Sequence, residues 1–164
     1  MSSLLWAQLE SHVDPAVLGA ITEGVWEMVA NAIEHSGDDA LIMGQVYRAH
    51  RGGLPPDHDD RVQVVIGDAG RGIRGSFLAT GTHEPESDLD AITLATEYLV
   101  SSVPDDPGRG QGLFTTIEQV VGVRGRMIIR SGEARVAISA EGHTHEAVPF
   151  LPGVIVALSL PLYP

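Results

Sequence analysis

The strongest constraint on the fold is a long helical pattern near the start of the chain. Between Asp14 and Ser36, apolar residues recur three and four positions apart, which places them on one face of an α-helix: Leu18, Ile21, Val25, Met28, Val29 and Ala32. Asp14 and Pro15 supply an N-cap followed by proline at the first helical position, and Gly37 is a suitable stop. A helix with one apolar face needs a second layer to cover that face.

Strands later in the chain can form that layer. Residues 40–50 (ALIMGQVYRAH) and 61–68 (RVQVVIGD) are typical of strands, and the polar residues 51–60 between them predict a hairpin loop too long for a tight turn. Three more strands are expected, over residues 124–131, 134–141 and 153–162.

The region between these two groups of strands is irregular. From Gly70 to Gly112 the pattern breaks into Gly, Pro, Ser and Asp, interrupted by a helix around 89–99, and a further helix should run from about Gly112 to Val121. A long irregular insertion in a compact domain usually has a function. The order of elements predicts a single domain over residues 1–164, an α/β sandwich with helices on one face of a mixed, mostly antiparallel sheet.

Composition excludes several classes of function. With 10 Lys plus Arg against 22 Asp plus Glu, the formal net charge is −12, so the chain would repel a nucleic acid backbone. All ten basic residues are arginine, and the absence of lysine excludes a P-loop and Schiff-base chemistry. The chain has no cysteine, which excludes disulfides, thiol nucleophiles and thiolate metal sites. The first 14 residues lack a basic start, and no membrane-spanning run is expected, so we predict a soluble, cytoplasmic protein.

The first helix carries a polar pair beside its apolar face. Glu27 and Asn31 lie one turn apart on one flank, where a carboxylate and an amide can hold a proton acceptor and a metal ligand in fixed register. Many helices carry such a pair on an ordinary solvated surface, so the pair alone does not indicate a site.

The segment GDAGRGI, residues 67–73, is more specific. Asp68 ends an apolar strand, and Gly70 and Gly72 allow a ligand to approach the backbone without meeting a Cβ atom. Asp68 would then accept a hydrogen bond from a flat ring. The alternative is a tight turn with a capping aspartate. The segment is not a dinucleotide-binding fingerprint, because no compact strand–turn–helix unit surrounds it.

A third segment, DPGRGQGLFTTIEQVVG, leads three alternating glycines into a helix. Backbone N–H groups at a helix N-terminus without side chains in the way can bind an anion, although a flexible loop before a helix would have the same composition.

In this order the three segments resemble the boxes of the Bergerat-fold or GHKL ATPases, the superfamily of gyrase, histidine kinases, MutL and a heat-shock chaperone. WEMVANAIEHS resembles the N box, GDAGRGI the first glycine box and GRGQGL the second, and the resemblance spans about Val17 to Leu162. It implies an ATP- and Mg²⁺-binding domain of the histidine-kinase-like ATPase type, with a long ATP lid at about residues 74–110.

The resemblance also implies roles for individual residues. Asn31 would coordinate Mg²⁺, and Glu27 would polarise a water, or a substrate hydroxyl as in the anti-sigma-factor serine kinases. Asp68 would accept the adenine amine. The remaining nucleotide contacts would come from Gly70, Gly72 and Ile73 of the first glycine box and from Gly108, Arg109, Gly110, Gly112 and Leu113 of the second. Glu23 and Glu34 are the other carboxylates on the same helix.

Two features depart from the family pattern. The family often has a Gly-Thr before its last strand, whereas this chain has Val154 at that place, so one polar contact to adenine is missing. The lid contains no lysine, so the phosphate charge would fall on magnesium, backbone amides and arginines such as Arg109 or Arg71.

Other polar clusters indicate less. His143 and His145 alternate as two metal ligands could, but they are expected in an exposed loop, and Asp57 to Asp60 are expected at a solvated hairpin tip.

The sequence therefore predicts a small soluble ATPase or serine/threonine kinase that regulates a protein partner, with a homodimer as one candidate assembly. The alternatives are a nucleotide sensor with little turnover and one domain of a larger signalling protein.

Overall fold

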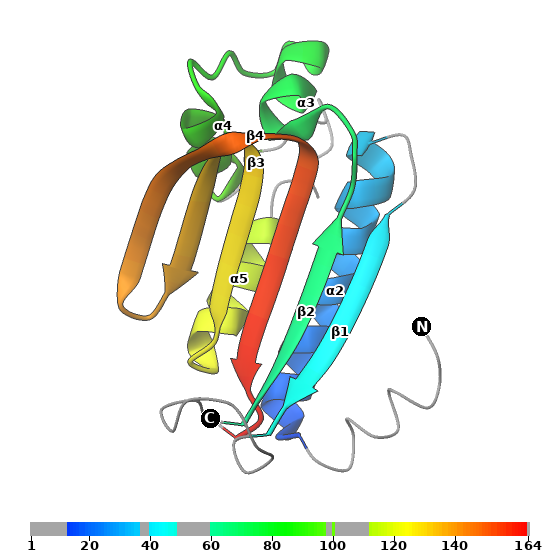
Figure 1. Ribbon diagram of the computed structural model, residues 1–164, viewed down its shortest axis with the longest axis vertical. Coiled ribbons are helices and arrows are strands. Elements are labelled where there is room, and N and C mark those ends of the chain that lie inside the picture. The colour runs from blue at the N-terminus through cyan, green and yellow to red at the C-terminus, as the bar shows by residue number, and fades with distance from the viewer. Residues whose placement is uncertain (1–12, 37–39, 49–59, 98–99, 101–111, 164) are drawn as a thin grey trace.

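The computed structural model describes residues 13–36, 40–48, 60–97, 100 and 112–163 (Figure 1). Within these residues four helices pack against a four-stranded antiparallel sheet in an α+β arrangement. The elements in chain order are α2 (Pro15–Ser36), β1 (Leu41–Tyr47), β2 (Arg61–Gly67), α3 (Gly72–Thr80), α4 (Asp88–Ala95), α5 (Gly112–Gly122), β3 (Arg126–Ser139) and β4 (Gly142–Pro161).

The sheet has the strand order β1-β2-β4-β3, so β1 and β3 form its two edges. Every ladder among the described strands is antiparallel, which corrects the prediction of a mixed sheet. The guanidinium of Arg48, just after β1, donates to Asp60, just before β2, at 3.0 Å, and this hydrogen bond raises the pKa of Arg48. It joins the two strands at the end away from Asp68.

The first helix matches its prediction closely. The backbone N–H of Ala16 donates to Asp14 Oδ1 at 2.8 Å, so Asp14 caps the helix, and α2 begins at Pro15 and ends at Ser36. Its apolar face is buried against β2 and β4, where the side chains of Val62, Val64 and Ile66 alternate inward. In Figure 1, α2 and α5 lie together behind the sheet, while α3 and α4 lie at one end of it.

Three predicted strands are two long ones in the structure. β3 runs through the expected break after residue 131, and β4 includes the segment containing His143 and His145, which is therefore a strand and not a loop, although both histidines are exposed. The ladder between β3 and β4 is irregular at Gly132, which has a φ of 59°. This bulge bends both strands, as Figure 1 shows, and lets the pairing continue.

The predicted lid segment contains more regular structure than expected. α3 occupies residues that the sequence places in an irregular region, and α4 ends at Ala95, earlier than predicted. Asp88, in the first turn of α4, accepts a hydrogen bond from the N–H of Glu133 at 2.9 Å, and a Cβ on Gly132 would overlap its carboxylate. Asp88 therefore anchors α4 to the bulge. The end of the predicted lid lies outside the described residues.

Helix α2 also bears on localisation. Residues Pro15–Glu34 are long and apolar enough to cross a membrane by length and composition alone, contrary to the expectation that no stretch would be. A buried core helix passes the same test, and one face of α2 packs on the sheet. Cytoplasmic localisation remains a prediction from the sequence.

Candidate functional site

Asp68 is held in a fixed orientation where β2 ends. Its backbone N–H donates to the carbonyl of Val154 on β4 at 2.9 Å, which ties it to the neighbouring strand. The N–H of Gly70 donates to Asp68 Oδ1 at 2.9 Å, an Asx turn of the kind expected for a capping aspartate. A carboxylate has about four acceptor positions, so this one bond leaves it able to accept from a ligand. Asp68 can therefore cap the turn and accept a hydrogen bond from a ligand at the same time.

Gly153 makes this strand end possible. Its φ is +78°, and a Cβ at this position would overlap the carbonyl oxygen of Asp68. Only glycine accommodates both the backbone conformation and the close approach. The sequence alone does not show why a glycine is needed at position 153, because Gly153 and Asp68 are far apart in the chain.

The first glycine box starts α3. Gly72 has a φ of +74°, and a Cβ there would lie 2.8 Å from the hydroxyl oxygen of Ser131 on β3. The same hydroxyl accepts the N–H of Ile73 at 3.0 Å. The buried Ser76 hydroxyl donates to the Gly72 carbonyl at 3.0 Å. Ser131 therefore fixes the entry to α3, a role that sequence reasoning missed and that no local pattern indicates.

Glu27 and Asn31 lie on the flank of α2 that faces α5. The two helices approach closely, because a Cβ on Gly24 would lie 2.9 Å from the Cγ2 atom of Thr116. One turn further along α2, the side chain of Glu27 packs directly on Gly112, the first residue of α5, and a Cβ on Gly112 would overlap the Glu27 carboxylate. The glycine thus leaves space for this carboxylate.

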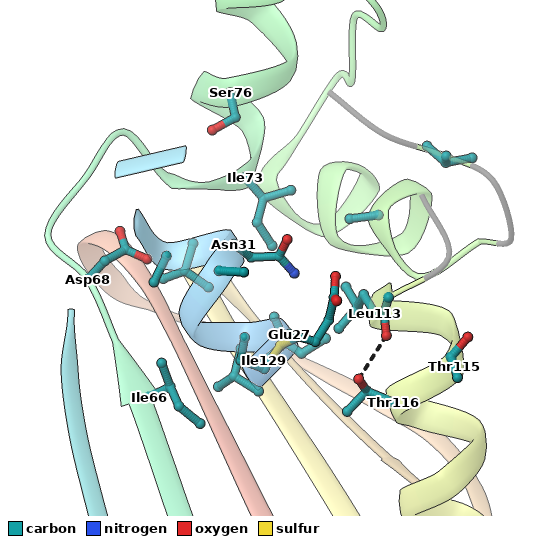
Figure 2. Close-up of a pocket in the computed structure, with 18 of the residues that line it drawn as sticks. Glu27, Asn31, Ile66, Asp68, Ile73, Ser76, Leu113, Thr115, Thr116 and Ile129 are labelled. Atoms are coloured by element: carbon teal, nitrogen blue, oxygen red, sulfur yellow. Dashed lines mark hydrogen bonds between the residues drawn. The ribbon is translucent and has the colours of Figure 1, made fainter. Parts of the chain in front are cut away.

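These elements enclose one cavity of about 550 Å³, within the range of cofactor sites. Its apolar walls come from the inward faces of the sheet and α2, and from α3, α4 and α5. Figure 2 shows Asp68 at one side of this pocket, Glu27 toward the other, near Leu113, and Asn31 between them. Two carboxylates and an amide from separate segments of the sequence therefore face one space.

Most of the predicted site residues that the structure describes line this cavity: Glu27, Asn31, Asp68, Gly72, Ile73, Gly112 and Leu113. Gly70 is described but does not line it, and contributes instead the N–H that orients Asp68. Gly108, Arg109 and Gly110 lie outside the described residues.

The cavity contains polar residues that the prediction did not assign. Glu23 lines it and accepts a hydrogen bond from Gln119 Nε2 of α5, linking the two helices one turn below Glu27. The sequence identifies Glu23 as another carboxylate of the same helix, and its position one turn before Glu27 is consistent with this place in the cavity. The other alternative carboxylate, Glu34, is not among the lining residues.

The electrostatics of the pocket are unusual for an anion site. Glu23, Glu27 and Asp68 line it, and none of its described lining residues is an arginine. The N-terminus of the 11-residue helix α5, which opens onto the cavity at Gly112, is the positive element among the described residues at that end. No cluster of three or more His, Cys, Asp or Glu that could hold a metal occurs within the part of the chain that the structure describes.

No protein-family model matches the chain, and comparison with curated proteins finds no match.

Proposed function

We propose that this chain is an ATP- and Mg²⁺-binding domain of the Bergerat (GHKL) type, and that it acts as a small cytoplasmic ATPase or serine/threonine kinase regulating a protein partner. The observation that carries the proposal is the convergence of Glu27, Asn31, Asp68 and Gly112 on one cavity of about 550 Å³. These residues belong to the three sequence segments that resemble the family's boxes, and nothing in the spacing of the three segments along the chain requires them to meet.

The Asp68 side of the cavity suits an adenine ring. The Asp68 carboxylate is held by Gly70 and has acceptor capacity left for the exocyclic amine. Apolar side chains, among them Ile66, Ile73 and Val156, line the same space and can pack on the flat faces of the ring. Val154 also lines the cavity, and its carbonyl fixes Asp68 through the backbone, so the residue in place of the usual threonine still supports the acceptor.

The opposite side suits phosphates only when a divalent cation accompanies them. Glu23 and Glu27 would repel a triphosphate, and the described lining residues offer no cationic side chain in compensation. Asn31 offers one neutral oxygen ligand, which fits Mg²⁺ because this ion prefers a few protein oxygens together with waters and substrate phosphates. The ion, when bound, would supply charge neutralisation for the phosphates.

We assign the role of general base to Glu27. In the proposed reaction its carboxylate takes the proton from a water or a serine hydroxyl, whose oxygen forms a bond to the γ-phosphorus while the bond from that phosphorus to the β,γ-bridging oxygen breaks, leaving ADP. Gly112 leaves room for the Glu27 carboxylate at the start of α5, where the helix N-terminus can stabilise phosphate oxygens.

Calorimetric titration with ATP and GTP, each with Mg²⁺, tests the binding proposal. We expect ATP to bind and GTP to be rejected, because guanine offers a carbonyl where Asp68 needs a donor, and an unpaired buried acceptor costs about 1–3 kcal/mol. Asp68→Asn should weaken ATP binding by a similar amount. Equal affinity for the two nucleotides, or unchanged ATP affinity in Asp68→Asn, would contradict the assignment.

Phosphate release by the purified parent protein separates the ATPase from the other activities. A kinase would instead transfer phosphate to a serine-bearing partner. Nucleotide binding without either reaction would favour the sensor, in which ATP changes a partner surface without turnover.

A further inference from the structure

An exposed apolar surface lies along the edge strand β1. It consists of side chains on the edge strand β1 and on the exposed flank of α2, and we call it the edge surface: Trp26, Ile33, Ile42 and Val46 on the helix side of the sheet, and Leu41 and Met43 on its other face. These six account for most of the large apolar side chains that are exposed in the described part of the chain. Trp26 is 69% exposed and Leu41 is 62% exposed. Exposed apolar surface gathered in this way marks an interaction site.

The backbone of β1 adds a directional feature to this surface. Among the strands that the structure describes, β1 pairs with β2 on one side only, so the N–H and C=O groups on its other side have no partner in any of these strands. Soluble proteins usually protect such an edge with charges, proline or a bulge. β1 reads LIMGQVY, without a charged residue or proline, and its ladder with β2 is regular over all seven residues. The edge is therefore suited to pair with another strand.

We propose that β1 pairs antiparallel with β1 of a second copy of this chain, forming a homodimer with a continuous eight-stranded sheet. Residues directly opposite in an antiparallel pair share a face, so a two-fold axis perpendicular to the sheet makes one residue face itself. Centring the axis on Gly44 pairs the whole strand, Leu41 with Tyr47 and Ile42 with Val46.

This register is chemically self-complementary. Ile42 and Val46 lie opposite the buried Ile66 and Val62 on β2, so they occupy the helix-side face, where they are 40% and 38% exposed. In the dimer they would pack on each other across the seam. The chain carries a net charge of −12, but no two charges meet along β1, so the general repulsion between copies is not concentrated at the interface.

The exposed flank of α2 fits the same assembly. α2 packs on β2 and β4 and leaves β1 uncovered on the helix side, as the exposure of Ile42 and Val46 indicates. Two helices that each lie between β2 and β4 of their own copy would be about four strand spacings apart, or about 19 Å. This exceeds the 8–10 Å of direct helix packing, so the gap needs large side chains. Trp26 and Ile33 are the large exposed apolar side chains of α2 that can reach into it.

Sedimentation of the full chain over a range of concentrations is the first test. We expect the parent to sediment with twice the mass of the chain and Val46→Lys to sediment as a monomer, because lysine on an edge strand opposes pairing. Leu78→Lys is the matched control, since Leu78 on α3 is also exposed (51%) but lies outside the edge surface. A parent that stays monomeric, or Val46→Lys that remains dimeric, overturns the proposal.

Charge exchange tests the register. Ile42→Lys combined with Val46→Glu in one chain places opposite charges across the seam twice, so the double variant should dimerise more tightly than either single variant. Circular dichroism checks that each variant is folded. Met43→Lys, on the other face of β1, is a second single substitution that should weaken the dimer. A double variant no better than the singles overturns the Gly44-centred register.

Cysteine cross-linking gives an independent test, because the natural chain has no cysteine. Gly44→Cys faces its own copy and should form a disulfide-linked dimer under mild oxidation. Tyr47→Cys is the control: it faces Leu41, and its own copy is six residues away, about 20 Å, too far for the roughly 7 Å limit between Cα atoms. Linkage through Tyr47→Cys, or none through Gly44→Cys, overturns the register. None of these tests depends on ATP binding, so the dimer and the proposed function fail separately.

Discussion

Replacing Gly112 with alanine tests the geometry of the proposed active site without altering a charged or polar group. The added Cβ would overlap three atoms of Glu27, its Cγ, Cδ and Oε1, so a small movement of the carboxylate does not relieve the contact. Glu27 must take another rotamer, or α5 must move away from α2. Gly24 and Thr116 already hold the two helices close together, so we expect the side chain to move.

The expected effects on stability and turnover differ in size. Alanine is favoured over glycine in a helix by up to about 1 kcal/mol, and a strained rotamer costs about 0.5–1.5 kcal/mol. These terms oppose each other, so the free energy of unfolding should change by no more than about 1 kcal/mol. Misplacing a catalytic group by about 1 Å can cost about 10²-fold in rate. Gly112→Ala should therefore stay folded and lose at least about 10²-fold in kcat.

The assay pairs phosphate release, or phosphotransfer to the partner, at saturating ATP with urea denaturation of the same samples. Gly19→Ala is the control, because no heavy atom lies within 4 Å of the Cβ it would add on α2. It should unfold at slightly higher urea and retain parental turnover. In a double-mutant cycle, Gly112→Ala should cost nothing further once Glu27→Ala is present. Parental kcat in Gly112→Ala would refute the argument that this glycine holds Glu27 in its catalytic position.

Two further predictions concern the same cavity. Asn31→Ala should weaken ATP binding in Mg²⁺ and remove most of the dependence of that binding on magnesium, because the carboxylates that line the cavity repel a triphosphate when no bound ion offsets its charge. Calorimetry with and without EDTA measures this dependence, and an unchanged dependence would exclude Asn31 as a ligand. Glu27→Ala should bind ATP about as well as the parent, or better because the Glu27 carboxylate no longer repels the phosphates, while turnover falls about 10²- to 10⁴-fold. Turnover that survives the substitution would point to Glu23 as the next carboxylate to test.

The sequence predicted the elements whose signals are local. The cap at Asp14, the apolar face of α2 and the start of α5 at Gly112 depend on neighbouring residues, and the structure confirms each of them. β2 is of the same kind, because the alternation of Val62, Val64 and Ile66 expresses its one buried face.

The incorrect predictions arose where distant residues decide the local structure. Gly132 was expected in a break between two strands and Gly153 at the start of a strand, yet both lie inside strands, with positive φ values that their neighbours require. Asp88 lies against Gly132, and the Asp68 backbone lies against Gly153. Neither contact can be read from a sequence window. α3 was missed for a similar reason, since glycines weaken its helical pattern and Ser131 on β3 fixes its first residues.

The candidate site was predictable to the extent that its residues lie at the ends or on the flanks of well-marked elements. Glu27 and Asn31 occupy one flank of a predicted helix, and Asp68 ends a predicted strand. The link between Glu23 and Gln119 was not predictable, because it depends on how α2 and α5 meet.

Helix α2 carries both proposed surfaces on adjacent residues. Glu27 lines the cavity, whereas Trp26, about 100° around the helix from it, belongs to the edge surface. A shift of α2 on dimerisation would move Glu27, the proposed general base, because Glu27 and Trp26 belong to one rigid helix. However, a Cβ on Gly24 would lie only 2.9 Å from Thr116 Cγ2, so α2 has little room to move toward α5, and its buried face is fixed on the sheet. Pairing through β1 adds strands beyond this core without requiring α2 to move. The cavity geometry should therefore be the same in monomer and dimer, and regulation through the dimer would need a partner that contacts α2 itself.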